Sequence, residues 1–556
     1  MILDFLLAFS LGQDPPPPPP PPSRPAVARD TTPERKGTAS IKGRVLTADG
    51  RPLRRAMVVV TGSELTDERT TSTGLEGEFL LDELPAGRYS LIVSRSGYLT
   101  TRYGQTRYGE PGTQLEVKNG ESIAKVDFRL ERAGVISGRV VDETGEAAAG
   151  VQMWALQPRF FRGSRRVVPV SSSQVRTDDA GNYRLIALPP GEYVVVGVLR
   201  ETWMSDEKQP RMLGYAPTYF PGTGNATEAQ RIKIAPGQEA AAIDFMLTAM
   251  RAATLSGTAT GSDGAPLAGG SVTLMYEVSG PTFTSMSMAG STRIAADGTW
   301  TLRDVPPGEY SLRAQAPVGG ERASESGTVR IAVQGADLSG LAISTDPGVV
   351  ISGTMVTDTG EPLPKGQLGI STGLATAEPS QVRTTPGKDD GIVAVDGTFA
   401  RRSMTGAVVV RSTGLPRGWA LRSVMVGNRD YAGTALELHA GRPIGGITVV
   451  ISNRLPTVSG RLVDDAGKPA DGVAILFPAD QTRWIEGGAT IRHTKADRSG
   501  AFRLDTVRPG EYLAVAVEYI QQWQVYDPEF LTPLRRSATK VTVGEEPVTI
   551  DLKVVR

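Results

Sequence analysis

Two short phrases recur along the chain with a fixed internal spacing. The opening phrase is an apolar residue, a small or basic residue and a glycine, followed by an acidic turn that contains glycine. Its five copies start at Ile41, Ile136, Leu255, Ile351 and Val458. The closing phrase joins a Gly-x-aromatic triplet to a Pro-Gly turn and a tyrosine. In four copies its two glycines are ten residues apart, at 77 and 87, 181 and 191, 298 and 308, and 500 and 510. This self-similarity predicts five repeated units.

Both phrases are typical of β-hairpins. Alternating apolar residues flank each Asp/Gly turn, as in two strands joined by a tight connection. In the closing phrase we expect Gly77 to adopt a positive φ and Phe79 to enter the core. Tyr89 then lies on the next strand, with its hydroxyl predicted near the rim. No segment has sustained helical periodicity, and residues 527–536 are the best candidate for a short helical turn.

The sequence therefore predicts an all-β chain, a tandem array of about five immunoglobulin-scale β-sandwich domains. The 64 glycines and 40 prolines agree with many tight turns. The fourth unit is divergent, because Gly406 follows Gly397 after nine residues and Val408 replaces the tyrosine. The predicted boundaries of the five sandwiches are 38–134, 135–253, 254–349, 350–456 and 457–556.

The two phrases together resemble the carboxypeptidase regulatory-like domain. That family is a transthyretin-like, starch-binding-like β-sandwich, found as repeats in large exported multi-domain bacterial proteins. The resemblance covers nearly all of residues 38–556 and is weakest in the fourth unit, which carries Leu415-Pro416-Arg417-Gly418-Trp419 instead of the Pro-Gly-x-Tyr turn. It implies an accessory or binding module. No peptidase domain accompanies it, because the chain has no His-x-x-Glu pair, so peptidase activity is not implied.

The N-terminus has the character of an export signal. Residues 1–13 hold an apolar run and are predicted as a signal peptide, although a basic start is missing and Asp4 interrupts the run. Residues 14–37 form a proline-rich linker whose prolines, 15–22, favour a stiff polyproline II spacer. The apolar run is too short to span a bilayer as a helix. We therefore expect an exported bacterial protein that is periplasmic, on the outer surface or secreted, with no transmembrane helix beyond this run.

Composition argues against several functions. Lys plus Arg and Asp plus Glu both number 60, so the chain has no electrostatic reason to bind nucleic acid. There is no cysteine, and the two histidines, His439 and His493, lie far apart in sequence. Neither a metal nor another cofactor is therefore expected. No nucleophile elbow, phosphate loop or paired-histidine motif occurs, so we predict that the chain is not an enzyme.

Aromatic residues in the variable tails of the units are the strongest surface candidates. Rings displayed on loops can stack on sugar faces, but aromatic side chains more often cover cores or domain junctions. Packing is therefore favoured over a ligand site for this set. The candidate ligand-binding residues are Trp203, Tyr215, Tyr219, Phe220, Trp484, Trp523 and Tyr526.

Two functions from different classes follow. The first is a non-catalytic structural or protein-interaction scaffold of the bacterial envelope, whose partners are envelope proteins. The second is a carbohydrate-binding array that holds polysaccharide through the tail aromatics. They differ in a checkable way, because a glycan site needs exposed rings and a scaffold buries them at junctions.

Overall fold

The computed structural model describes residues 37–555 apart from 63, 66, 162, 171–174, 280–283, 318–324, 376–389, 417, 487 and 522. The predicted signal peptide and nearly all of the proline-rich linker lie outside the described residues. Within the described ranges the chain is all-β, and its strands form five consecutive two-sheet sandwiches, each with its own hydrophobic core.

The first sandwich packs a β4-β1-β8 sheet, with β9 also on β1, against a β3-β2-β5-β6 sheet, with β7 also on β5. Ile41, Val45 and Tyr89 are fully buried between them. Its strands are β1 (Ala39–Thr47), β2 (Met57–Gly62), β3 (Arg69–Ser72), β4 (Glu78–Leu84), β5 (Gly87–Ser94), β6 (Thr101–Arg102), β7 (Leu115–Val117), β8 (Ser122–Ile123) and β9 (Phe128–Leu130).

The second sandwich has the same plan with additions. Its sheets are β14-β10-β20, with β21 on β10, and β12-β11-β15-β18, with β13 and β19 at the sides, and a third sheet, β16-β17-β22, extends from them. The strands are β10 (Gly134–Val141), β11 (Gln152–Phe161), β12 (Ser164–Pro169), β13 (Val175–Arg176), β14 (Asn182–Leu188), β15 (Gly191–Val198), β16 (Thr202–Met204), β17 (Met212–Ala216), β18 (Thr218–Tyr219), β19 (Ile232–Ile234), β20 (Glu239–Ala240), β21 (Phe245–Met246) and β22 (Thr248–Arg251).

The third and fourth sandwiches are simpler. The third pairs β26-β23-β29 with β25-β24-β27-β28, and the fourth pairs β32-β30-β37-β34-β35 with β31-β33-β36. Their strands are β23 (Ala253–Thr260), β24 (Ser271–Ser279), β25 (Thr284–Arg293), β26 (Thr299–Val305), β27 (Gly308–Gln315), β28 (Ser326–Val333), β29 (Leu338–Ser344), β30 (Val349–Thr357), β31 (Gly369–Leu374), β32 (Thr398–Ser403), β33 (Gly406–Thr413), β34 (Ala420–Val426), β35 (Arg429–Asp430), β36 (Leu436–Leu438) and β37 (Ile444–Ser452).

The fifth sandwich joins its two sheets through β45, which pairs in parallel with both β38 and β42. It also carries the described helices, η1 and η2 of the 3-10 type and α1, which begins after the N-cap Asp527 within the predicted segment 527–536. The elements are β38 (Val458–Val463), β39 (Val473–Pro478), η1 (Gln481–Arg483), β40 (Arg492–Lys495), β41 (Ala501–Leu504), β42 (Gly510–Val517), η2 (Gln524–Tyr526), α1 (Pro528–Leu534), β43 (Thr539–Val543), β44 (Val548–Thr549) and β45 (Leu552–Val555).

The closing phrase folds as a strand, a turn and a second strand, with its glycine and aromatic residue placed as predicted. Gly77 has φ +72°, and Phe79, two residues later, is 5% exposed in the core. The tyrosine hydroxyl, expected near the rim, lies against the preceding Pro-Gly turn. Tyr89 is fully buried, and its hydroxyl donates a 2.6 Å hydrogen bond to the carbonyl oxygen of Pro85 in the preceding turn. Tyr193 makes the equivalent bond to Pro189. The turn carbonyl thus gives the tyrosine hydroxyl a hydrogen-bond partner in both sandwiches.

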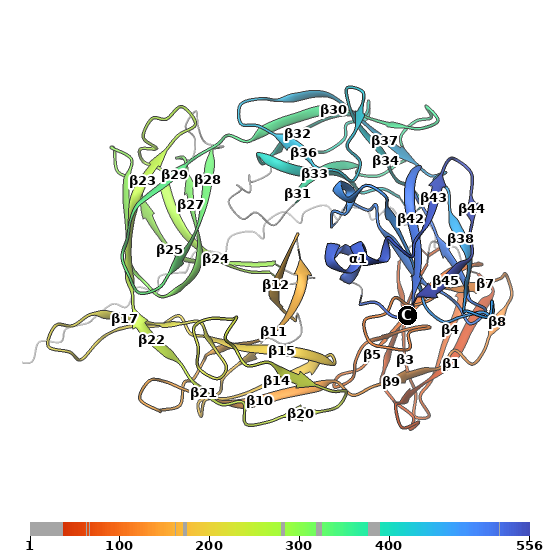
Figure 1. Cartoon of the computed structure of the whole chain (residues 1–556), viewed down its shortest axis with the longest axis horizontal. Coiled ribbons are helices and arrows are strands. Elements are labelled where there is room, and N and C mark those ends of the chain that lie inside the picture. The colour runs from red at the N-terminus through yellow and green to blue at the C-terminus, as the bar shows by residue number, and fades with distance from the viewer. Residues whose placement is uncertain are drawn as a thin grey trace, which may run out of the picture.

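The five sandwiches follow one another around a ring, so that the last, in blue, lies beside the first, in red (Figure 1). The β11–β12 hairpin of the second sandwich points toward the middle of this view and meets α1 of the fifth. Arg165 on β12 forms ion pairs there with Asp527, at 2.7 Å, and Glu529, at 3.0 Å. Residues more than 350 positions apart in sequence therefore close the chain on itself.

Candidate interaction site at the ring closure

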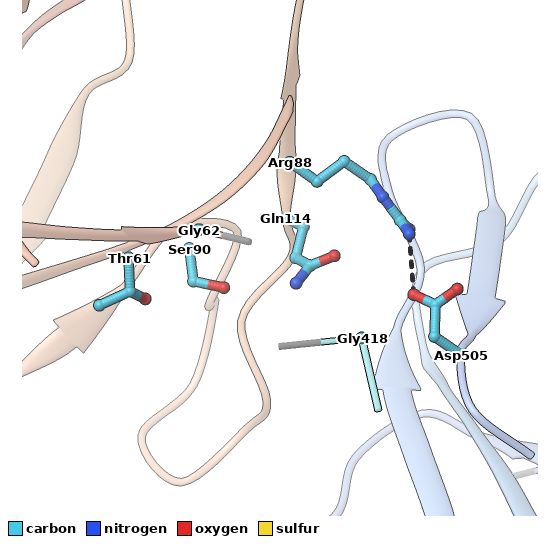
Figure 2. Close-up of a pocket in the computed structure, with 7 residues that line it drawn as sticks. All are labelled: Thr61, Gly62, Arg88, Ser90, Gln114, Gly418 and Asp505. Carbon is cyan, nitrogen blue, oxygen red and sulfur yellow. Dashed lines mark hydrogen bonds and ion pairs between the residues drawn. The ribbon is translucent and has the colours of Figure 1, made fainter. Parts of the chain in front are cut away.

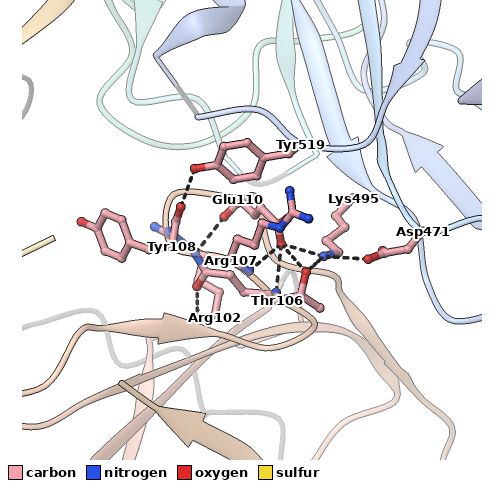
Figure 3. A network of polar contacts seen from close by, with 9 residues as sticks. Arg102, Thr106, Arg107, Tyr108, Glu110, Asp471, Lys495 and Tyr519 are labelled. Atoms are coloured by element: carbon pink, nitrogen blue, oxygen red, sulfur yellow. Dashed lines mark hydrogen bonds and ion pairs between the residues drawn. The ribbon is translucent and has the colours of Figure 1, made fainter. Parts of the chain in front are cut away.

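A loop of the first sandwich, residues 103–114 between β6 and β7, reaches the fifth sandwich and buries a carboxylate there. Glu110 is 3% exposed. Its Oε2 accepts hydrogen bonds from the backbone N–H of Thr106 and of Arg107, from the Thr106 hydroxyl and from Lys495 Nζ (Figure 3). Burial raises the pKa of Glu110, but the hydrogen bonds from Lys495, Thr106 and Arg107 outweigh it and hold this pKa below its ordinary value.

The partner of this carboxylate comes from the last residue of β40. Lys495 is 5% exposed and places Nζ 2.6 Å from Glu110 Oε2 and 2.8 Å from the Thr106 hydroxyl. Asp471 of the fifth sandwich lies 3.5 Å from the same Nζ. Removing one partner of such a pair leaves the other charge buried and unpaired, which lowers the free energy of unfolding by roughly 3–5 kcal/mol. The pair is therefore satisfied only while the two sandwiches are in contact.

Aromatic and backbone contacts extend this joint. The hydroxyl of Tyr519, which follows β42, donates a 2.8 Å hydrogen bond to the backbone carbonyl of Tyr108. The Arg107 guanidinium lies over the Tyr519 ring, 5.5 Å from its centroid. Figure 3 shows both loops meeting at this point. The 103–114 loop is thus fixed to the fifth sandwich by charge, by hydrogen bonding and by ring contact.

A small polar pocket lies beside this joint, where the first, fourth and fifth sandwiches meet (Figure 2). Its volume is about 390 Å³, and Arg88 and Asp505 form a 2.9 Å ion pair across it. The other lining residues are Thr61, Gly62, Ser90, Gln114 and Gly418. Hydroxyl, amide, guanidinium and carboxylate groups can hydrogen-bond a polar ligand, and the carboxylate of Asp505 is already paired with Arg88.

The candidate aromatic residues of the second sandwich pack against its cores. Tyr215 is 9% exposed, and its hydroxyl donates to Glu143 at 2.6 Å. Trp203 stacks on Tyr215 with 4.5 Å between ring centroids, and Phe220 contacts Phe245 edge-on. Tyr219 is half-buried against a separate cluster around Trp154. These contacts favour packing, and a ligand role for these rings stays a prediction.

The candidates of the fifth sandwich also lie close to apolar side chains. Trp484 is 6% exposed, packs on Phe477 and donates from Nε1 to the carbonyl of Pro478 at 2.8 Å. Tyr526 packs against the same core, and Trp523 is half-buried, with Nε1 donating to Gln521. Sugar stacking on these rings stays a prediction as well.

The residues that close the ring carry no local signature in the sequence. Glu110 and Lys495 are 385 positions apart, and each is one of many charged residues in a turn or at a strand end. The one local sign is the tail between β5 and β7, which is rich in tyrosine and arginine and longer than a hairpin needs. It marks a loop with its own contacts but does not identify the partner.

Neither a metal-binding cluster nor a bilayer-spanning helix is found in the part of the chain that the structure describes. In that part of the chain no group of three or more acidic or histidine side chains is arranged to hold a metal ion. Burial and the neighbouring Arg492 lower the pKa of His493 to about 4, which keeps this imidazole neutral near pH 7. None of the described helices has the length and apolar content that a bilayer crossing requires.

Two of the sandwiches match the model of a known domain family. The model of the carboxypeptidase regulatory-like domain matches residues 40–131 and 254–344. The chain carries two carboxypeptidase regulatory-like domains. These regulatory-like domains are the first and third sandwiches, and no peptidase domain is among the matches. No curated protein matches the chain significantly.

Several solved structures are similar to the chain at low identity. The minor pilin GBS52 of Streptococcus agalactiae is 11% identical, covers 38% of this chain and 95% of its own, and gives a TM-score of 0.21. A streptococcal ancillary pilin is 12% identical, covering 56% of this chain and 99% of its own, with a TM-score of 0.20. The 3-chlorocatechol 1,2-dioxygenase of Rhodococcus opacus is 13% identical, with coverage of 19% and 63% and a TM-score of 0.14. These scores are too low to assign a function.

Proposed function

We propose that the chain is an exported, non-catalytic scaffold of a bacterial envelope, which presents a preformed ring of five sandwiches to protein partners. The observation that supports it most is the buried Glu110–Lys495 pair, because it joins the first and last sandwiches directly. A buried ion pair is satisfied in one geometry only, so it favours one arrangement of the first and fifth sandwiches before any partner binds. Preorganisation of this kind lowers the entropic cost of association.

The regulatory-like domains support a binding or accessory role, since such sandwiches bring no catalytic groups of their own. The proposal extends to a periplasmic, outer-surface or secreted location, with envelope proteins as the partner class. The alternative is polysaccharide binding through the tail aromatics. The burial of Tyr215 and Trp484 gives it little support, because a sugar site needs exposed rings.

The test combines location with partner capture. An epitope-tagged full chain is expressed in its native cell, and the cytoplasmic, periplasmic, membrane and medium fractions are separated. We expect the protein outside the cytoplasm, cross-linked to defined envelope proteins. Lys495→Glu should lose these cross-links, and Lys540→Glu, at an exposed position on β43, should keep them. A cytoplasmic location would overturn export. Saturable binding to a polysaccharide array, lost on Trp523→Ala, would replace the scaffold by the carbohydrate alternative.

A further inference from the structure

The junction between the fourth and fifth sandwiches gathers three arginine side chains, here called the arginine cluster: Arg483, Arg492 and Arg508. Arg483 ends η1, Arg492 begins β40 and Arg508 precedes β42. Arg508 donates from Nε to the carbonyl of Leu421 in the fourth sandwich at 2.9 Å, and from Nη2 to the carbonyl of Gly488 at 3.1 Å.

Backbone contacts hold the cluster in one place. Arg483 Nη2 donates to the carbonyl of Ala432 in the fourth sandwich, and Arg492 Nη2 donates to that of Thr506, each at 3.1 Å. The neighbouring Gly433 lies so close that a Cβ there would be 3.1 Å from Arg508 Nη1. Arg508 is 5% exposed, whereas Arg483 and Arg492 are half-buried. The cluster is therefore closed on the Arg508 side, and solvent reaches only part of the Arg483 and Arg492 side chains.

None of these three side chains forms an ion pair within the described ranges, and all their hydrogen bonds to protein go to carbonyl oxygens, apart from a long contact with the Thr506 hydroxyl. Each also keeps a buried N–H group without a partner. These groups are Nε of Arg483, Nε of Arg492 and Nη1 of Arg508. Unpaired buried donors and charges are costly.

One nearby carboxylate offsets part of this charge, but in the described residues it forms no ion pair with the cluster. Asp430 lies close enough to act on Arg508, but its Oδ1 already accepts from the backbone N–H of Val424 and of Ala432. Burial, together with the charges of Arg492 and Arg483, lowers the pKa of Arg508 to about 10, so the side chain remains protonated near pH 7. By contrast Arg422, at the same junction, pairs with Glu545 and Asp358.

We propose that the arginine cluster is a binding site for a small tetrahedral oxyanion, phosphate or sulfate, held between the fourth and fifth sandwiches. Guanidinium groups present fixed forks of donors that match the oxygens of such anions. Donors arriving from η1, β40 and the turn before β42 suit an anion with oxygens in several directions better than a planar carboxylate. The bound anion would supply the missing counter-charge and join the two sandwiches.

The experiment is titration calorimetry of the full chain with sodium sulfate and sodium phosphate, at an ionic strength held constant with sodium chloride. We expect saturable binding with one anion per chain. Arg492→Gln, at a half-buried position, should weaken binding about tenfold, because it removes a charge-assisted hydrogen bond. Arg508→Met should abolish it. Arg422→Gln is the matched control, an arginine of the same junction that has carboxylate partners, and should bind as the unaltered chain does.

Other results would overturn the proposal. Salts such as sulfate also stabilise proteins by exclusion from their surface, without saturation and without dependence on one side chain. A heat signal that does not saturate, or that is equal in Arg492→Gln and Arg422→Gln, would mean that no site exists. Acetate binding as tightly as sulfate would overturn the assignment to a tetrahedral anion. Arg492 is half-buried, so we expect Arg492→Gln to fold. This variant therefore tests the site even if Arg508→Met fails to fold.

Discussion

The opening phrase requires glycine because two backbone segments approach each other closely at this position. In each sandwich the opening strand passes against backbone that lies just before or within the later strand that pairs with it in parallel. A Cβ on Gly138 would lie 2.2 Å from the carbonyl oxygen of Ile243, a distance that real structures do not tolerate. The same clash would occur at Gly43, Gly257, Gly353 and Gly460. The repeat of this glycine in all five units is therefore a packing requirement.

Gly138→Ala should destabilise the second sandwich by about 1–3 kcal/mol or more, because backbone atoms must move to admit the methyl group. Gly224→Ala is the matched control in the same sandwich, since a Cβ there meets nothing within 4 Å. Hydrogen exchange of the β10 and β14 amides measures the effect locally. Equal protection in the two variants would contradict this account of the glycine.

Tyr89→Phe should cost about 1–3 kcal/mol in the first sandwich, since the carbonyl of Pro85 loses the hydroxyl that donates to it. Tyr98→Phe serves as the control, because the Tyr98 ring lies under Arg132 and this contact survives loss of the hydroxyl. Hydrogen exchange of the β5 amides would reveal the difference. Unchanged exchange in Tyr89→Phe would show that the hydroxyl contributes nothing net.

At the scale of the element, the sequence is informative where a strand or turn depends on its own residues. The positive φ of Gly77, the burial of Phe79 and the helical turn capped by Asp527 all follow from local chemistry. The joint between Glu110 and Lys495 does not, because either residue taken alone is an ordinary surface charge. Only the path of the whole chain brings them together, so no local pattern could identify this part of the site.

The 103–114 loop should release the fifth sandwich in acid. The pKa of Glu110 is lowered in the folded state, so its contribution to closure is complete above the ordinary glutamate value. It is lost as the pH falls below the ordinary value of 4.5 toward the lowered pKa of Glu110. The chain has no cysteine, so dyes on Asn119→Cys and Arg498→Cys can report the distance between the two sandwiches by energy transfer.

In this assay we expect the unaltered chain to open on acidification. Glu110→Gln should be partly open already at pH 7 and should show a smaller response to acid, since it cannot supply the counter-charge to Lys495. Glu116→Gln, which removes an exposed carboxylate from β7, should behave as the unaltered chain. Opening that is identical in all three proteins would assign the acid response to other groups.

At the scale of the whole molecule, five sandwiches of similar plan form a closed arrangement instead of an extended array. Ion pairs between residues far apart in sequence contribute to this, among them Glu110 with Lys495, Arg88 with Asp505, and Arg165 with Asp527. They are not equivalent. Arg88 and Asp505 are both more than a third exposed, so solvent screens them and their contribution is small. Only the Glu110–Lys495 pair is buried on both sides.

Lys495→Glu should therefore open the ring, because it places two carboxylates in one buried site. Small-angle X-ray scattering of the full chain should show a larger radius of gyration and maximum dimension than the unaltered protein has.

Adding Glu110→Lys to Lys495→Glu restores opposite charges but should recover closure only in part. The backbone N–H groups of Thr106 and Arg107 point at position 110 and suit an anion, whereas an ammonium group there would face two donors. Full recovery would mean that charge pairing alone decides closure, and an unchanged profile in Lys495→Glu would assign closure to the other contacts, such as those of Arg165 and Tyr519.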